Sequence, residues 1–176
     1  MLRNSATLVP PLGTPPPRAP LYTPEQRLRR DSSVWTVVQG VLAPVQFVVF
    51  LVSLALVVRF LLTGEGWDWA AGSVVAKTLT LYTIMVTGCI WEKVVFDCYL
   101  FAPAFFWEDV FSMLVLALHT AYLGALWAGT LGDTALMALA LAAYAAYVVN
   151  AAQFLWKLRM ARLDEARAPR APEIAP

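Results

Sequence analysis

Four long apolar runs divide the chain, and short stretches of polar residues separate each run from the next. The runs cover about residues 34–62, 70–91, 110–131 and 135–156. Each is long enough for a helix that crosses the hydrocarbon core of a bilayer, which takes about 20 residues. Because only helices and closed barrels satisfy their backbone inside a bilayer, the pattern predicts an all-α integral membrane bundle of four transmembrane helices.

The segments outside the four runs predict how the chain is organised. Residues 1–20 contain six prolines and almost no periodic pattern, so we expect a disordered proline-rich tail. Residues 21–163 form the transmembrane domain, which begins with a short helix that Thr23 caps and Pro24 starts. Residues 164–176 are polar and contain prolines, and we expect them to be frayed.

Composition agrees with a membrane protein and excludes several classes of function. Of the 176 residues, 60% are hydrophobic and 14% are charged, and the mean hydropathy is +0.63. A net charge of +1 offers no basic surface for nucleic acid. Cys89 and Cys98 form no disulfide framework or metal pattern, and no histidine pair for a haem is present. We therefore expect no cofactor held by the protein itself.

The positions of the basic residues predict the orientation of the bundle. Ten lysines and arginines lie in the two terminal segments, and Lys93 lies between the second and third runs. The opposite face carries only Arg59. Because cytoplasmic loops of membrane proteins carry an excess of these residues, we predict that both termini are cytoplasmic.

The stretch 90–109, between the second and third runs, has the most unusual composition. It combines several carboxylates with a lysine, two tryptophans and four phenylalanines. A carboxylate at the centre of a membrane helix costs about 2.5 to 3.5 kcal/mol on insertion scales. Glu92, Glu108 and Asp109, which stand close to the apolar runs, are therefore candidate functional groups.

Polar residues of all four runs also fall at one level, toward the predicted cytoplasmic side. They are Gln46 in the first run, Thr87 and Glu92 in the second, Glu108, Asp109 and Ser112 in the third, and Asn150 and Gln153 in the fourth. Glu108 and His119 are eleven residues apart, which places them about 20° apart around a helix. Ser112 and Tyr122 lie near the same line, and Lys77 and Trp91 belong to a comparable stripe on the second run. Because lipid offers these groups no partner, we expect both stripes to face the interior of the bundle.

The charged residues also have ordinary structural interpretations. Glu108 and Asp109 are typical of a helix N-terminus, where they complement the macrodipole. Glu92 is consistent with an ion pair to Lys93 at the interface. Lys77 is consistent with a side chain that extends to the outer surface.

The remaining polar and aromatic residues leave similar alternatives open. Asn150 and Gln153 are typical of residues that form hydrogen bonds between membrane helices. The tryptophans and phenylalanines are typical of anchors at the membrane interface. His119 lies near the midplane without a route to water, which favours a functional role. The residues thus indicate a carboxylate-bearing polar pocket that opens toward the cytoplasm. Proton-transfer chemistry or the binding of a flat amphiphile fits such a pocket.

Several segments resemble the 3-vinyl bacteriochlorophyllide hydratases. They are LYTIMVTG (81–88), IWEKVVF (90–96), LFAPAFFWEDVFSM (100–113) and ALHTAY (117–122), with YTPEQR (22–27) and YVVNAAQFLWK (147–157) at the two ends. The likeness covers about residues 20–163. It implies addition of water to the 3-vinyl group of chlorophyllide a or of a bacteriochlorophyllide precursor, which yields a 1-hydroxyethyl group.

The same resemblance implies a setting and a set of partners. The setting is bacteriochlorophyll synthesis, and the location is the inner, photosynthetic or intracytoplasmic, membrane of a bacterium, as a multi-pass protein. The expected partners are the tetrapyrrole substrate, the lipid bilayer and neighbouring enzymes of the pathway, and the substrate carries its own magnesium.

A mechanism follows from the chemistry of hydration. Protonation of the terminal vinyl carbon gives a cation next to the conjugated macrocycle, and water captures it there. We expect Glu108 to be the acid, because an apolar environment keeps a carboxylic acid protonated, and Glu92 or Asp109 to be the base. Three roles are open for His119: axial ligand of the substrate magnesium, holder of a water, or base.

The remaining candidates are residues expected to contact the substrate. They are Gln46, Lys77, Thr87, Trp91, Phe105, Trp107, Ser112, Tyr122, Asn150 and Gln153. Two other functions share this pattern: a pigment carrier or assembly factor without catalysis, and a proton or ion pathway built on Lys77, Glu108 and His119. The pathway ranks last, because the carboxylates cluster on one side of the membrane.

Overall fold

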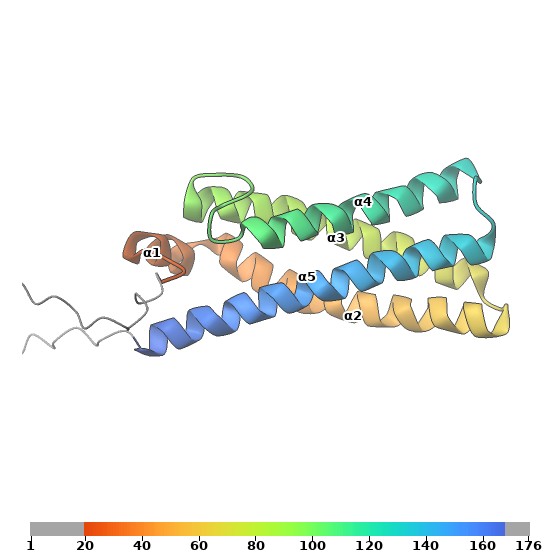
Figure 1. Ribbon diagram of the computed structural model, residues 1–176, viewed down its shortest axis with the longest axis horizontal. Helices are drawn as coiled ribbons and strands as arrows, with labels where there is room; N and C mark the ends of the chain where they lie inside the picture. Colours follow the sequence, from red (N-terminus) through yellow and green to blue (C-terminus); the bar gives the residue numbers. More distant parts are fainter. Residues whose placement is uncertain (1–19, 168–176) are drawn as a thin grey trace, which may run out of the picture.

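The computed structural model describes residues 20–167, which fold into five helices and contain no strand (Figure 1). The helices are α1 (Pro24–Ser32), α2 (Val34–Thr63), α3 (Trp67–Phe96), α4 (Phe106–Ala128) and α5 (Asp133–Arg167). The last four are each long and apolar enough to cross a membrane, which confirms the predicted fold class. Of the predicted proline-rich tail, residues 1–19 lie outside the described residues, as do residues 168–176 at the other end.

The helix boundaries differ from the predicted ones in ways that matter for the site. α3 runs on to Phe96 and α4 starts at Phe106, so the predicted loop between residues 91 and 110 is shorter in the structure. α5 runs on through residues 157–167, where we had placed the end of the fourth run and a frayed tail. Apolar runs mark only the part of a helix within hydrocarbon, whereas backbone hydrogen bonding continues into the polar interface.

The turn between α2 and α3 lies at the opposite end of the bundle from the α3–α4 loop. Gly64 and Gly66 both have positive φ values, 73° and 84°, which glycine adopts without the steric cost of a Cβ atom. Gly64 ends α2 in the left-handed conformation, and its N–H donates to the carbonyl of Phe60. The chain therefore reverses within three residues, and α3 starts at Trp67 rather than at the predicted residue 70.

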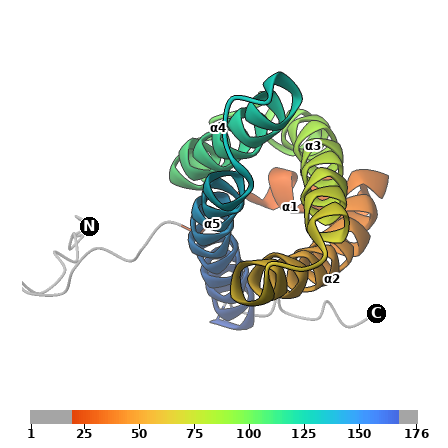
Figure 2. The same cartoon turned by 90° about the vertical axis from the view of Figure 1, so that its right-hand side faces the viewer.

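The four long helices surround one axis, in the order α2, α3, α4, α5 when seen from the end (Figure 2). Large apolar side chains such as Val48, Val52 and Leu114 are exposed on the outside, where lipid would contact them. The interior combines apolar residues with polar ones: Ser53, Lys77, Thr78 and His119 are completely buried. The predicted polar stripes thus face the interior. Lys77 does not extend to the surface, so that structural alternative is wrong.

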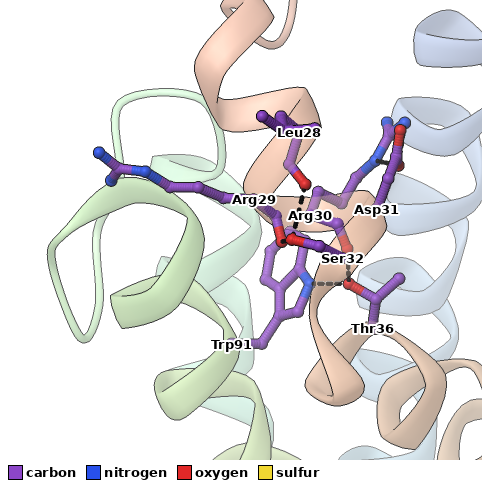
Figure 3. Close-up of polar contacts among 7 residues, drawn as sticks. All are labelled: Leu28, Arg29, Arg30, Asp31, Ser32, Thr36 and Trp91. Carbon is purple, nitrogen blue, oxygen red and sulfur yellow. Dashed lines mark hydrogen bonds and ion pairs between the residues drawn. The ribbon is translucent and has the colours of Figure 1, made fainter.

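The short helix α1 covers the end of the bundle at which the α3–α4 loop lies (Figures 1 and 3). Thr23 and Gln26 cap its N-terminus reciprocally, with each side chain accepting the backbone N–H of the other. At its other end the indole N–H of Trp91 donates to Thr36 Oγ1, whose own hydroxyl donates to the carbonyl of Arg30. These bonds attach α1 and the start of α2 to the end of α3.

An ion pair adds to this attachment at the surface. Arg29 Nη1 lies 2.7 Å from Asp97 Oδ2, just beyond the end of α3. The hydrogen bond from Arg29 and its positive charge lower the pKa of the Asp97 carboxyl from its usual value. Asp97 has a left-handed backbone, φ 65°, and ends α3 in the way that glycine more often does.

Candidate functional site

Two carboxyl groups meet where the end of α3 faces the start of α4. Glu92 and Asp109 are only 6% and 5% exposed, and their carboxyl groups are close enough to interact electrostatically. Glu92 Oε2 has no hydrogen-bond partner among residues 20–167. Two adjacent carboxylates repel each other, and one proton shared between them removes that repulsion. The pair is therefore suited to hold and release a proton.

The α3–α4 loop brings this pair together. Phe101 adopts a left-handed backbone conformation, φ 61°, which is unusual for an aromatic residue. Its backbone N–H donates to Asp109 Oδ2 at 2.7 Å, which ties the middle of the loop to the first turn of α4. Asp109 and Glu108 also stand where the macrodipole of α4 favours negative charge. Glu92 and Lys93 do not form the ion pair that the sequence suggested, because Lys93 donates to the carbonyl of Asp97 instead.

Glu108 has a partner that we did not predict. Lys157 of α5 lies 3.1 Å from Glu108 Oε2, and its ammonium also donates to the carbonyl of Ala104. The Glu108 side chain is 8% exposed and that of Lys157 is 24% exposed. The spacing 150, 153, 157 places Lys157 on the same helix face as Asn150 and Gln153, and this was the sequence signal that could have revealed it.

A groove of about 470 Å³ opens to the outside between α4 and α5. Its lining consists of Glu108, Val148, Val149, Ala152, Gln153 and Trp156. Glu108 is the only carboxyl group in this lining, and Gln153 Oε1 has no hydrogen-bond partner in the described part of the chain. Val148 and Trp156 are half or more exposed, so an apolar molecule in the surrounding lipid could reach Glu108.

A second groove, of about 420 Å³, lies at the end of the bundle. Pro20, Leu21, Gln26, Phe96, Pro103, Ala104, Trp156, Lys157, Met160 and Asp164 line it. Trp156 borders both grooves, and the Glu108–Lys157 ion pair joins one groove to the other. Neither groove is an enclosed cavity between the helices.

His119 lies in the interior of the bundle and lines neither groove. Its Nδ1 atom is 2.8 Å from the carbonyl oxygen of Val115, which can only accept a hydrogen bond. Nδ1 therefore carries the proton, and Nε2 presents a lone pair. His119 stands about 16 Å from Glu108 along α4, eleven residues at 1.5 Å each. A single site would require His119 to lie beside the carboxylates, and it does not.

The expected contact residues fall into several groups. Ser112 and Asn150 are hydrogen-bonded across α4 and α5 at 2.9 Å, so the expected interhelical role of Asn150 is confirmed. Thr87 accepts a hydrogen bond from Gln39 of α2 at 2.7 Å. Phe105 is buried among aromatic rings, whereas Trp107 is 67% exposed. The others, Gln46, Lys77 and Tyr122, are buried in the interior, and Trp91 binds Thr36.

Fold and site together define a small multi-pass membrane protein in which one buried carboxyl group, that of Glu108, lines an outward-facing apolar groove. In the part of the chain that the structure describes, no group of three or more His, Cys, Asp or Glu side chains is placed to hold a metal ion.

This chain belongs to the 2-vinyl bacteriochlorophyllide hydratase family, whose model matches residues 22–160. It is 67% identical over 151 residues to the 2-vinyl bacteriochlorophyllide hydratase of Rhodobacter capsulatus, which covers 86% of this chain and 88% of the relative. It is 66% identical over 148 residues to the protein of the same name from Cereibacter sphaeroides, covering 84% and 92%. No solved structure matches the chain. The resemblance seen in the sequence is confirmed.

Proposed function

We propose that this chain is a hydratase that adds water to the 3-vinyl group of chlorophyllide a or of a bacteriochlorophyllide precursor. The product is the 3-(1-hydroxyethyl) pigment. The observation that carries the proposal is the family match over residues 22–160, together with two hydratases about two-thirds identical to the chain. The enzyme is a carbon–oxygen hydro-lyase of bacteriochlorophyll synthesis.

The groove between α4 and α5 is our candidate for the substrate site. A tetrapyrrole is a flat, largely apolar molecule that enters the bilayer, and this groove is open on the side that lipid would contact. Val148, Val149 and Ala152 supply an apolar floor, and Trp156 offers a ring for stacking. The reaction edge of the pigment would then lie against Glu108, at one end of the membrane. Passage of the pigment to and from other enzymes of the pathway through the inner, photosynthetic membrane is consistent with this opening.

Glu108 is the one carboxyl group in that groove, so we assign to it the proton transfer at the vinyl group. Glu108 is a carboxylate in its ion pair with Lys157, so it first takes a proton from the Glu92–Asp109 pair. That proton forms the new bond to the terminal vinyl carbon, and the electron pair of the double bond supplies that bond. A water oxygen then bonds to the neighbouring carbon, and a proton of that water returns to Glu108. Lys157 stabilises the carboxylate that Glu108 becomes between these two steps.

The Glu92–Asp109 pair lines neither groove. The charge of Glu108 acts on Asp109. We assign to the pair the role of a proton store that exchanges with Glu108. This arrangement needs no cofactor held by the protein, and the substrate brings its own magnesium.

The decisive experiment is turnover by purified protein in lipid with chlorophyllide a and water alone. Loss of the vinyl group shifts the pigment absorption to shorter wavelength, and the hydroxyethyl product is identified by mass. We expect turnover by the wild type and its loss in Glu108→Gln. Glu65→Gln, at an exposed carboxyl in the α2–α3 turn, is the matched control and should remain active. Pigment that binds and is recovered unchanged would indicate a carrier instead of an enzyme.

A further inference from the structure

Polar atoms without protein partners follow one another through the interior of the bundle. They are Lys77 Nζ, His119 Nε2, Tyr122 Oη, Gln46 Oε1 and Asn150 Oδ1, none of which has a hydrogen-bond partner among residues 20–167. Lys77, His119 and Tyr122 are completely buried. An unsatisfied polar group inside a membrane protein costs several kcal/mol, so a polar occupant is required here.

The kinds of atom in this row identify the occupant. Lys77 Nζ only donates hydrogen bonds, and its contact with the Tyr147 ring, 3.9 Å from the centroid, provides no acceptor lone pair. His119 Nε2 accepts, because Nδ1 carries the proton. The Gln46 and Asn150 oxygens also accept. An anion would serve only the donors and a cation only the acceptors, whereas water serves both.

The register of α4 gives this row a direction. Its buried face carries Glu108, Ser112, Val115, His119 and Tyr122 in succession. His119 and Ser112 are seven residues apart, about 10 Å along the axis, which is too far for a direct hydrogen bond. Ser112 is itself held by Asn150. One turn further along α4 is Glu108, at the groove.

A neighbouring set of side chains satisfies its own hydrogen bonds. Ser53 Oγ shares hydrogen bonds with Ser73 Oγ at 2.7 Å and with Tyr144 Oη at 2.5 Å. The Tyr144 ring is 5.9 Å from the ring of His119, so this set lies beside His119. On α4 the row runs from Tyr122 through His119 toward Glu108.

We propose that a file of ordered water molecules runs inside the bundle along the inward face of α4, from Lys77, His119 and Tyr122 to Glu108. Its use rests on the proposed function: these waters would be the store from which the hydration draws its water while the pigment closes the groove. The bilayer side of the groove is apolar and offers no such supply.

The test is hydroxyl-radical footprinting of the full chain in lipid nanodiscs, read by mass spectrometry. Radicals generated from water held inside a protein modify the side chains next to that water. We expect Tyr122, although completely buried, to be modified several times faster than Tyr82. Tyr82 is the matched control, since it is a partly exposed tyrosine on the outside of α3 whose hydroxyl bonds Thr120. A rate at Tyr122 equal to or below that at Tyr82 overturns the proposal.

A variant gives a second, independent measurement. Lys77→Met keeps the length of the side chain and removes its hydrogen-bond donors, so labelling of Tyr122 and His119 should fall at least about twofold. Arg59→Met, at an exposed cation of α2, should leave both rates unchanged. Unchanged labelling of Tyr122 and His119 in Lys77→Met would refute the claim that Lys77 binds these waters.

Neither measurement uses turnover, so the two proposals fail separately. An active hydratase with unlabelled Tyr122 refutes the water file alone. A labelled interior in a protein without turnover refutes the hydratase and leaves the file in place.

Discussion

Lys157 of α5 lies 3.1 Å from Glu108 of α4 and joins the last helix of the bundle to the groove at which we place the reaction. The contact is largely shielded from water, since Glu108 is 8% exposed. The same ammonium donates to the carbonyl of Ala104 in the α3–α4 loop. One cation thus holds a loop, a carboxylate and a helix in a single arrangement.

Replacing this cation should lower the rate more than the affinity for pigment. We expect Lys157→Met to reduce kcat about tenfold to a hundredfold, somewhat less than the loss of a buried oxyanion-hole donor, because Lys157 is a quarter exposed. Lys157→Arg should retain most of the activity. Steady-state kinetics in nanodiscs measures kcat and the affinity for pigment. Arg159→Met is the control, because Arg159 is an exposed cation two residues further along α5. A kcat of Lys157→Met equal to that of the wild type would remove Lys157 from the mechanism.

The carboxyl pair should be as sensitive as Glu108 itself. We expect Glu92→Gln and Asp109→Asn each to lower kcat by about 10²–10⁴-fold, the usual contribution of general acid–base catalysis. Asn at position 109 can still accept the hydrogen bond from the Phe101 N–H, whereas Ala cannot. Asp109→Asn should therefore have the melting temperature of the wild type, whereas Asp109→Ala should have a lower one. Wild-type turnover in both isosteric variants would show that no proton passes through the pair.

His119 separates two placements of the pigment. In the groove between α4 and α5 the pigment does not meet His119, so His119→Ala should bind magnesium and zinc pigments with unchanged affinity and absorption spectrum. A pigment inside the bundle would use Nε2 as an axial ligand and lose it in this variant. Titration of each pigment into wild type and variant, followed in the absorption spectrum, decides between them. A weakened, shifted complex would move the substrate from the groove into the interior.

The sequence predicted what depends on the distribution of apolar residues. The four spanning helices followed from run length, and the inward stripe of α4 from the spacing of Glu108, Ser112, His119 and Tyr122, because a lipid-facing position would leave those groups without partners. The capping of α1 by Thr23 was also predicted and is confirmed. These features need only local geometry and the bilayer as solvent.

What the sequence could not predict depends on the α3–α4 loop. Glu92 and Asp109 are joined by a loop in which Asp97 and Phe101 adopt left-handed backbones, and the loop contains no glycine that would indicate such a turn. Lys157 was assigned to a terminal charge cluster, because the apolar run ends one residue before it while the helix does not. Lys77 stays inside because its ammonium packs on the Tyr147 ring of another helix, a contact that spacing within one helix cannot reveal.

The hydrogen bonds between Ser53, Ser73 and Tyr144 should stabilise the bundle. Tyr144→Phe removes the hydroxyl and leaves Ser53 without one of its partners, so we expect a loss of about 0.6 to 1.7 kcal/mol in the free energy of unfolding. Reversible unfolding in mixtures of mild detergent and SDS measures this. Tyr99→Phe, in the exposed loop, should lie within error of the wild type. Equal stability of the two variants would mean that this set contributes nothing.

The attachment of α1 should depend on pH only under strongly acidic conditions. Arg29 lowers the pKa of Asp97 in the folded protein, so the ion pair contributes fully above the carboxyl's ordinary value of about 3.9. The contribution is lost as the pH falls through the lowered value. Hydrogen exchange of α1 amides, corrected for the intrinsic effect of pH, should thus be unchanged between neutral pH and about 5 and rise only below about 4.

Asp97→Asn provides the matched control for this effect. It removes the negative charge at every pH, so α1 of this variant should exchange faster at neutral pH and show no further rise in acid. Its capping box remains, because Thr23 and Gln26 do not contact Asp97. If wild-type α1 instead loosened between neutral pH and 5, a different group would have to hold it, since Asp97 stays ionised throughout that range.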